Sequence, residues 1–330
     1  MTGSEHGIPP LAAPVREWIR RAEELSAAIP GIDSDDPAAR RLAAWELSDL
    51  LALEFTEPAG DGVRVDETVV AGGDGLLRAR RFRPESASGL LPTVLWLHGG
   101  GWVGGTIDEI VNERLCADRA LRSGVQLISL EYRLAPEHPF PAAVEDAVAA
   151  LADLRLRTDE LGIDPSRLGI GGNSAGATIA ASTALCERDA GRALHHQTLE
   201  VLPATLRPTG GSFTRHRRAS GMEGAEVLAD VYRAGAPLAE ASPLEAADHR
   251  DLPPALILVA EFDPLRDGAV AYAEALRAAG VPVTLRVGEG HVHGSPGVTR
   301  WQGARDWRDA LTAELAAAYA PLSVSTTARP

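Results

Sequence analysis

The sequence predicts an α/β fold, with a mostly parallel central sheet flanked by helices and a helical cap. Two glycine-rich runs carry this prediction, because each directly follows a short apolar segment that is typical of a buried strand. His98-Gly99-Gly100-Gly101-Trp102 follows Thr93–Leu97, and Gly172-Asn173-Ser174-Ala175-Gly176 follows Leu168–Gly171. Strands and helices then alternate along the chain, which favours one sheet over separate domains. We therefore expect residues 61–322 to form a single main domain.

The first 60 residues predict a helical segment that precedes this domain. Apolar residues recur at helical spacing from Val15 to Ile29, and a second amphipathic stretch runs from Ala38 to Phe55. The proline-bounded stretch Pro30–Pro37 separates the two. We expect two helices that cover apolar surface of the main domain.

The Gly-x-Ser-x-Gly run places Ser174 on a tight turn between a strand and a helix. Only glycine leaves room at the flanking positions of such a turn, so the serine is exposed as a nucleophile. The small residues of Ala175–Leu185 predict the helix that follows and allow it to pack closely on the sheet. The upstream glycine run offers backbone N–H groups that could converge on a developing oxyanion. Together the two runs indicate acyl transfer through a covalent serine intermediate.

A carboxylate for this chemistry is expected after the next predicted strand, Ala255–Ala260. The expected chain order for a serine on this kind of turn is serine, then an acid, then histidine. Asp263 comes just past the strand end, where sites in α/β folds gather, and is the favoured residue. Asp267 is the alternative, but it is better placed to begin the helix Gly268–Ala279.

Two histidines follow the predicted strand Val283–Val287, and either could be the base. His291 and His293 have the spacing of a metal pair on one strand face, but no third ligand with suitable spacing stands near them. His293 precedes Gly294, which suits an exposed turn. We expect no metal and no cofactor.

Composition limits the classes of partner. A net charge of −14 over 330 residues argues against binding to nucleic acid or to an anionic membrane surface. No apolar run approaches the roughly 18 residues of a membrane span, and we see no secretory leader. Cys116 and Cys186 fall in predicted helices and are expected to be packed, reduced thiols of a cytoplasmic protein. Residues 323–330 are expected to form a loose tail.

The motifs resemble those of the hormone-sensitive-lipase-like branch of the α/β-hydrolases, which includes bacterial carboxylesterases. The resemblance runs from about Val63 to Ala318. It rests on the two glycine-rich runs, Tyr132–Ala142, Asp263–Asp267 and His293-Gly294. The chain departs from the family at Asn173 and at Ser295. A serine at position 295 resembles a subset of the family that is related to acetyl and heroin esterases.

The resemblance implies roles for these residues. It implies Ser174 as nucleophile, Asp263 as orienting acid and His293, rather than His291, as base. It implies oxyanion donors, which are the N–H groups of Gly100, Gly101 and Ala175. It also implies that residues 1–60 belong to a cap.

A second cap segment is expected at about 212–238, with a helix at Met222–Arg233. Trp102, directly after the glycine run, is a candidate wall of the substrate pocket. It could instead pack beneath the cap without touching substrate.

These expectations converge on a serine carboxylesterase for short-chain acyl esters. Its expected partner is a small-molecule ester, with a homodimer left open. Two alternatives remain at this stage. One is another serine acyl-group enzyme, either an amide hydrolase or an acyltransferase, because fold and nucleophile do not fix the acceptor. The other is a binding protein on the same fold, like the plant gibberellin receptors that lack the histidine.

Overall fold

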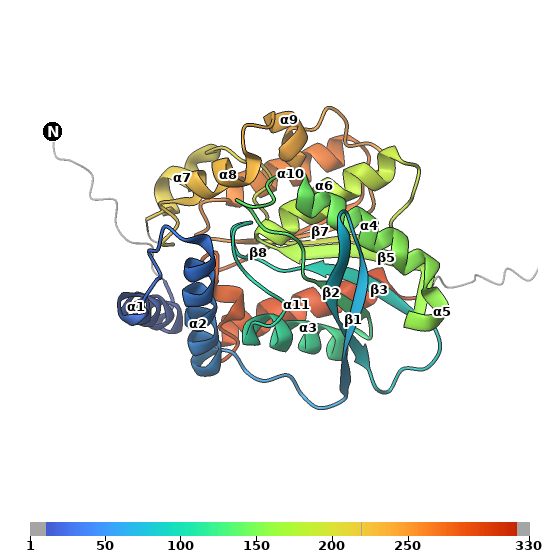
Figure 1. The fold of residues 1–330 in the computed structure, drawn as a ribbon, viewed down its shortest axis with the longest axis horizontal. Coiled ribbons are helices and arrows are strands. Elements are labelled where there is room, and N and C mark those ends of the chain that lie inside the picture. Colours follow the sequence, from blue (N-terminus) through green and yellow to red (C-terminus); the bar gives the residue numbers. More distant parts are fainter. Residues whose placement is uncertain (1–10, 219, 322–330) are drawn as a thin grey trace, which may run out of the picture.

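The structure is a computed structural model that describes residues 11–218 and 220–321. One mixed sheet runs through the molecule in the order β1-β2-β4-β3-β5-β6-β7-β8 (Figure 1). The first two pairings, β1 with β2 and β2 with β4, are antiparallel, and the others are parallel. The strands are β1 (Val63–Gly72), β2 (Gly75–Pro84), β3 (Leu91–Leu97), β4 (Gln126–Leu130), β5 (Ile163–Asn173), β6 (Gln197–Glu200), β7 (Ala255–Ala260) and β8 (Val283–Gly288). This arrangement confirms the predicted α/β-hydrolase fold.

Helices cover both faces of the sheet. The longer ones are α1 (Ala13–Ala28), α2 (Pro37–Phe55), α3 (Ile110–Ser123), α4 (Ala142–Leu156), α6 (Ala175–Asp189), α10 (Arg266–Ala278) and α11 (Gln302–Ala318). The shorter ones are α5 (Thr158–Leu161), α7 (Gly210–His216), α8 (Ala225–Arg233) and α9 (Leu238–Ala241). None of the helices in the described residues is long and apolar enough to cross a membrane.

Strand β3 contributes apolar side chains to the core on both faces of the sheet. Side chains alternate across a strand, so Leu95 and Leu97 join the core cluster beneath α4, α6 and α10. Val94 and Trp96 point the other way, into the cluster that α3 and α11 cover. All four side chains are buried, because helices pack on both faces.

The predicted strands that carry the glycine-rich runs, and the later ones, are all present. Helix α8 begins at Ala225 rather than at Met222, because Gly224 precedes it in a turn. The antiparallel β1–β2 ribbon and β6 were not among the predicted strands. Residues 323–330, the predicted tail, lie outside the described residues.

The two N-terminal helices are present with nearly the predicted bounds. Helix α2 begins after Asp36, whose side chain accepts a hydrogen bond from the Ala38 N–H at 3.1 Å. Helix α1 buries Val15 in a small cluster with Leu11 and Val292. Figure 1 shows both helices at one end of the sheet, beside the segment that carries α7 and α8.

The prediction for the cysteines is half right. Cys116 is buried between α3 and the sheet, and burial raises the pKa of its thiol to about 11. Cys186 is exposed, so its prediction as a packed thiol was wrong. It lies in the last turn of α6 and is absent from the buried residues of that helix.

Candidate active site

Ser174 lies on the turn between β5 and α6. Its backbone has φ 53° and ψ −122°, a strained conformation for a residue with a side chain. The Ser174 N–H donates to the Glu200 carbonyl oxygen on the neighbouring β6 at 2.9 Å, which holds the turn. A Cβ at Gly176 would lie 2.0 Å from the Leu97 carbonyl oxygen, so only glycine permits this approach of α6 to β3.

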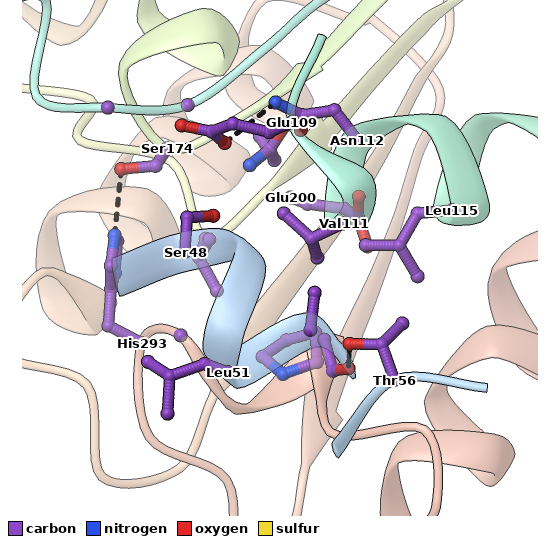
Figure 2. A pocket seen from close by; sticks show the side chains of 18 of the residues that line it. Ser48, Leu51, Thr56, Glu109, Val111, Asn112, Leu115, Ser174, Glu200 and His293 are labelled. Atoms are coloured by element: carbon purple, nitrogen blue, oxygen red, sulfur yellow. Dashed lines mark hydrogen bonds between the residues drawn. The ribbon is translucent and has the colours of Figure 1, made fainter. Parts of the chain in front are cut away.

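Ser174 begins a chain of hydrogen bonds that joins three loops at the carboxyl ends of parallel strands. Its Oγ lies 2.8 Å from His293 Nε2 (Figure 2). His293 Nδ1 lies 2.8 Å from Asp263 Oδ2. The buried Asp263 carboxylate accepts a further hydrogen bond through Oδ1, from the Leu265 N–H at 2.8 Å. The structure thus brings together the three residues that the sequence favoured.

Asp267 lies in the first turn of α10, which agrees with the prediction that it begins this helix rather than pairing with the histidine. Its Oδ2 accepts a hydrogen bond from the Ser212 N–H at 2.9 Å, and this bond ties α7 to α10. These contacts make Asp267 an anchor for the 212–238 segment and leave Asp263 as the partner of His293.

His291 is buried away from Ser174. Its Nδ1 lies 2.8 Å from Ser295 Oγ, and its Nε2 lies 3.1 Å from the Gly303 carbonyl oxygen. Its ring packs between Trp301 and Trp307, and burial lowers the pKa of the imidazole. In the sequence, Ser295 was only a departure from the family. In the structure its hydroxyl group contacts His291 and Val292 and so stabilises the loop that carries both histidines.

The upstream glycine run turns back on itself beside Ser174. Gly100 has φ 125°, and a Cβ there would lie 2.1 Å from the Gly104 carbonyl oxygen. The Gly104 N–H donates to the Gly100 carbonyl oxygen at 3.0 Å and closes the turn. Among the residues that the structure describes, no protein acceptor is paired with the N–H of Gly100, Gly101 or Ala175. These three N–H groups are therefore available to an outside acceptor.

Arg41 on α2 holds the N-terminal helices against the main domain. Its guanidinium donates to the carbonyl oxygens of Val103 and Ala135, each at 2.7 Å, and pairs with the Glu137 carboxylate. Val103 directly follows the glycine run. No sequence motif predicts this contact, because it joins Arg41 to residues more than sixty positions away.

Two cavities meet at Ser174, and we call them the larger cavity and the smaller cavity. The larger cavity has a volume of about 280 Å³ and the smaller one about 60 Å³. His293 lines the larger cavity only. Side chains lining the larger cavity include Trp18, Ser48, Leu51, Thr56, Glu109, Val111, Asn112, Leu115, Arg119, Asn173 and Glu200. Side chains lining the smaller cavity include Trp102, Pro203, Leu206, Phe213, Met222, Leu228, Ala229 and Leu265.

A buried ion pair lies in the lining of the larger cavity. Arg119 pairs with Glu200 while its guanidinium stacks over the Trp96 ring at 4.3 Å. Glu200 also accepts a hydrogen bond from Trp307 Nε1 at 2.7 Å. Both charges are therefore compensated, as burial requires.

Trp102 contacts both a helix of the 212–238 segment and a cavity at Ser174, and its contact with substrate stays a prediction. Its ring stacks on Tyr232 of α8, with centroids 5.0 Å apart, and it is buried beneath that helix. The same side chain lines the smaller cavity beside Ser174.

Within residues 11–218 and 220–321, no group of three or more His, Cys, Asp or Glu side chains is arranged to hold a metal ion. The ring nitrogens of His291 lie against Ser295 and Gly303, whereas those of His293 lie against Ser174 and Asp263.

Comparison with known proteins finds relatives that are named as esterases. A family model described as alpha/beta hydrolase fold matches residues 94–296. The carboxylic ester hydrolase LipN of Mycobacterium tuberculosis is 39% identical over 254 residues, which cover 71% of this chain and 65% of LipN. The chain thus spans slightly less than two thirds of that relative. Esterase LipI of the same organism is 36% identical, with 73% of this chain and 78% of LipI covered.

Solved structures agree with the sequence relatives. An ester hydrolase from the metagenome of Lake Arreo, bound to a bipyridine phosphonate derivative, superposes with a TM-score of 0.83 at 33% identity. The superposition covers 93% of this chain and 98% of that one.

Proposed function

The chain belongs to the hormone-sensitive-lipase-like branch of the α/β-hydrolases, and on this premise we propose that it is a serine carboxylesterase for short-chain acyl esters. The observation that carries the proposal is the hydrogen-bonded chain from Ser174 through His293 to Asp263. This arrangement matches the roles that nucleophile, base and orienting acid must play.

The proposed reaction has two halves. His293 Nε2 takes the proton of the Ser174 hydroxyl as Oγ attacks the ester carbonyl carbon. Asp263 holds the imidazole by its Nδ1–H and stabilises the imidazolium. The intermediate collapses, the bond to the alcohol oxygen breaks, and His293 returns the proton to that oxygen. Water then attacks the acyl-enzyme by the same steps, releasing the acid and regenerating Ser174.

The oxyanion of each intermediate is proposed to accept hydrogen bonds from Gly100, Gly101 and Ala175. Their N–H groups are unpaired in the described part of the chain and flank Ser174. Ala175 is the first residue of α6, so its N–H also lies at the positive end of the helix. Preorganised donors of this kind cost no reorganisation when charge develops.

We assign the alcohol half of the ester to the larger cavity and the acyl half to the smaller one. The departing alcohol oxygen must receive its proton from His293, which lines only the larger cavity. The acyl group then lies along Trp102, Leu228 and Leu265 in the smaller cavity. A small, mostly apolar cavity favours short acyl chains, roughly two to six carbons, because longer chains would clash with its end.

We also propose that two segments act together as the cap. Residues 1–60 contribute Trp18 and Ser48 to the larger cavity, and the segment at about 212–238 contributes Phe213 and Leu228 to the smaller one. The remainder of residues 61–322 forms the catalytic domain beneath them. The segments are anchored through Arg41 and Asp267, as described above.

An acyl-length series on soluble esters tests this function. We expect kcat/KM to peak at short acyl chains and to fall for long ones. A maximum at long-chain triglyceride with activation at an oil–water interface would contradict a capped esterase. Faster turnover of matched amides would indicate an amide hydrolase, and capture of the acyl group by added alcohols in preference to water would indicate an acyltransferase.

A further inference from the structure

Glu109 is a carboxyl group beside the reacting serine for which the proposed reaction has no use. It directly precedes α3 and lines the larger cavity together with Ser174 and His293. Figure 2 shows its carboxyl group extending from the start of α3 toward Ser174. An ester bound at Ser174 with its alcohol half in this cavity would meet Glu109.

The carboxyl group is held in place by neighbours rather than neutralised by a cation. Glu109 Oε2 accepts a hydrogen bond from Asn112 Nδ2 at 3.0 Å, and Asn112 also donates to the Thr106 carbonyl oxygen at 2.8 Å. Ser48 of α2 lines the same cavity and contributes a hydroxyl group to the surroundings of Glu109. The basic residue of the lining, Arg119, is already paired with Glu200.

These surroundings favour the uncharged form of the carboxyl group. Burial, with the nearby Asp49 and Glu131 carboxylates, raises the pKa of Glu109 to about 8, against the opposing hydrogen bond from Ser48. A protonated carboxyl presents one O–H donor and a carbonyl acceptor. An alcohol hydroxyl offers the complementary acceptor and donor, whereas an ammonium group offers only donors.

On the basis of the proposed esterase reaction, we propose that Glu109 is a specificity-determining residue that favours esters whose alcohol half carries a hydroxyl group. A methyl group at the same position would displace water from Glu109 without replacing the hydrogen bond that the water made. Leaving a half-buried polar group unpaired in this way is what lets a site reject an analogue that lacks the hydroxyl.

The test compares hydroxyethyl, hydroxypropyl and hydroxybutyl acetates with propyl, butyl and pentyl acetates, which carry methyl in place of the terminal hydroxyl. The measured quantity is the ratio of kcat/KM within each matched pair. In the wild type we expect a ratio of about ten or more at the chain length that reaches Glu109. Glu109→Leu should lower that ratio about tenfold, whereas Glu109→Gln, which keeps a donor and an acceptor, should retain most of it.

Glu113→Leu is the matched control, because Glu113 lies one turn along α3, is exposed, and pairs with Arg80 at 3.1 Å outside the cavity. That variant should keep the wild-type ratio. If Glu109→Leu does not fold, Glu109→Ala removes the same group without adding bulk and must show the same loss.

A wild-type ratio near one at every length would overturn the proposal, as would an unchanged ratio in the leucine and alanine variants. If the wild type hydrolyses none of the six esters, that result would instead contradict the proposed esterase function.

Discussion

The two cavities at Ser174 differ in which part of the chain builds them. The larger cavity lies between α2 and α3 and contains the carboxyl, amide and hydroxyl groups of Glu109, Asn112 and Ser48. The smaller cavity lies beneath α8 and is lined mostly by apolar side chains. Its charged residues, Arg207 and Glu226, pair with Glu245 and Arg217 and remain partly exposed.

Given the proposed assignment of alcohol and acyl halves to the two cavities, we expect the enzyme to recognise the two halves of an ester independently. One serine serves both cavities, so a change at Ser174 must affect every ester. A change in one cavity should alter the preference for one half of the substrate and leave the other preference in place. The following predictions test this separation.

The largest effect is expected from Ser174→Ala. Loss of the nucleophile should lower kcat by on the order of 10⁴ or more for every ester, whichever cavity the ester fills better. Steady-state kinetics measures this loss, and circular dichroism should show an intact fold. A pure variant that keeps most of its esterase activity would be incompatible with the proposed mechanism.

His293→Ala should be nearly as damaging, because serine and base act as a unit. His291→Ala should cost far less activity, since His291 contacts Ser295 and Gly303 rather than Ser174. Its main expected effect is a lower melting temperature from the lost packing against Trp301 and Trp307. The opposite order of activities would show that the wrong histidine has been assigned as base.

Leu228→Trp should shorten the preferred acyl chain. Leu228 lines the smaller cavity, and each methylene that no longer fits forfeits up to about 0.8 kcal/mol, close to fourfold in kcat/KM. Val227→Trp is the matched control, because Val227 is 65% exposed on the same helix. The hydroxyl-to-methyl ratio of the alcohol series should stay unchanged in both variants. An equal change in acyl and alcohol preference would show that the two cavities do not recognise the two halves of the ester separately.

The smallest expected effect is a pH dependence specific to the larger cavity. Because the pKa of Glu109 is raised to about 8, the group is neutral below that pH and negative above it. The negative form opposes the charge that develops on the substrate oxyanion, and Arg119 cannot offset it while paired with Glu200. Between about pH 7 and about pH 9, kcat/KM for propyl acetate should therefore fall a few-fold in the wild type relative to Glu109→Gln. Parallel profiles for the two enzymes would show that Glu109 does not titrate beside the reaction.

The catalytic loops were predictable because their signals are local. An apolar strand followed by Gly-x-Ser-x-Gly specifies a turn at Ser174 from adjacent residues alone. Parallel strands bring their carboxyl ends to one edge, so Asp263 and His293 could be expected beside the serine. The choice of His293 over His291 needed the family resemblance, because both residues follow the same strand.

The cavity linings were not predictable because they depend on contacts between distant segments. Glu109 reads as an ordinary acidic residue before a helix, and its meeting with Ser48 requires α2 to dock on α3. Arg41 carries no motif for the same reason, since its partners lie more than sixty positions away. Cys186 was misjudged because a position in a helix does not say which face of that helix meets the sheet.

Labelling with a fluorescent phosphonate ester tests whether Ser174 is the nucleophile. Such a reagent reacts irreversibly with an activated serine, and peptide mapping by mass spectrometry locates the adduct. We expect one adduct per chain, on Ser174, with activity lost in proportion to labelling and no adduct in Ser174→Ala. Loss of activity with the adduct on another residue, or full labelling of Ser174 with activity retained, would rule out Ser174 as the nucleophile.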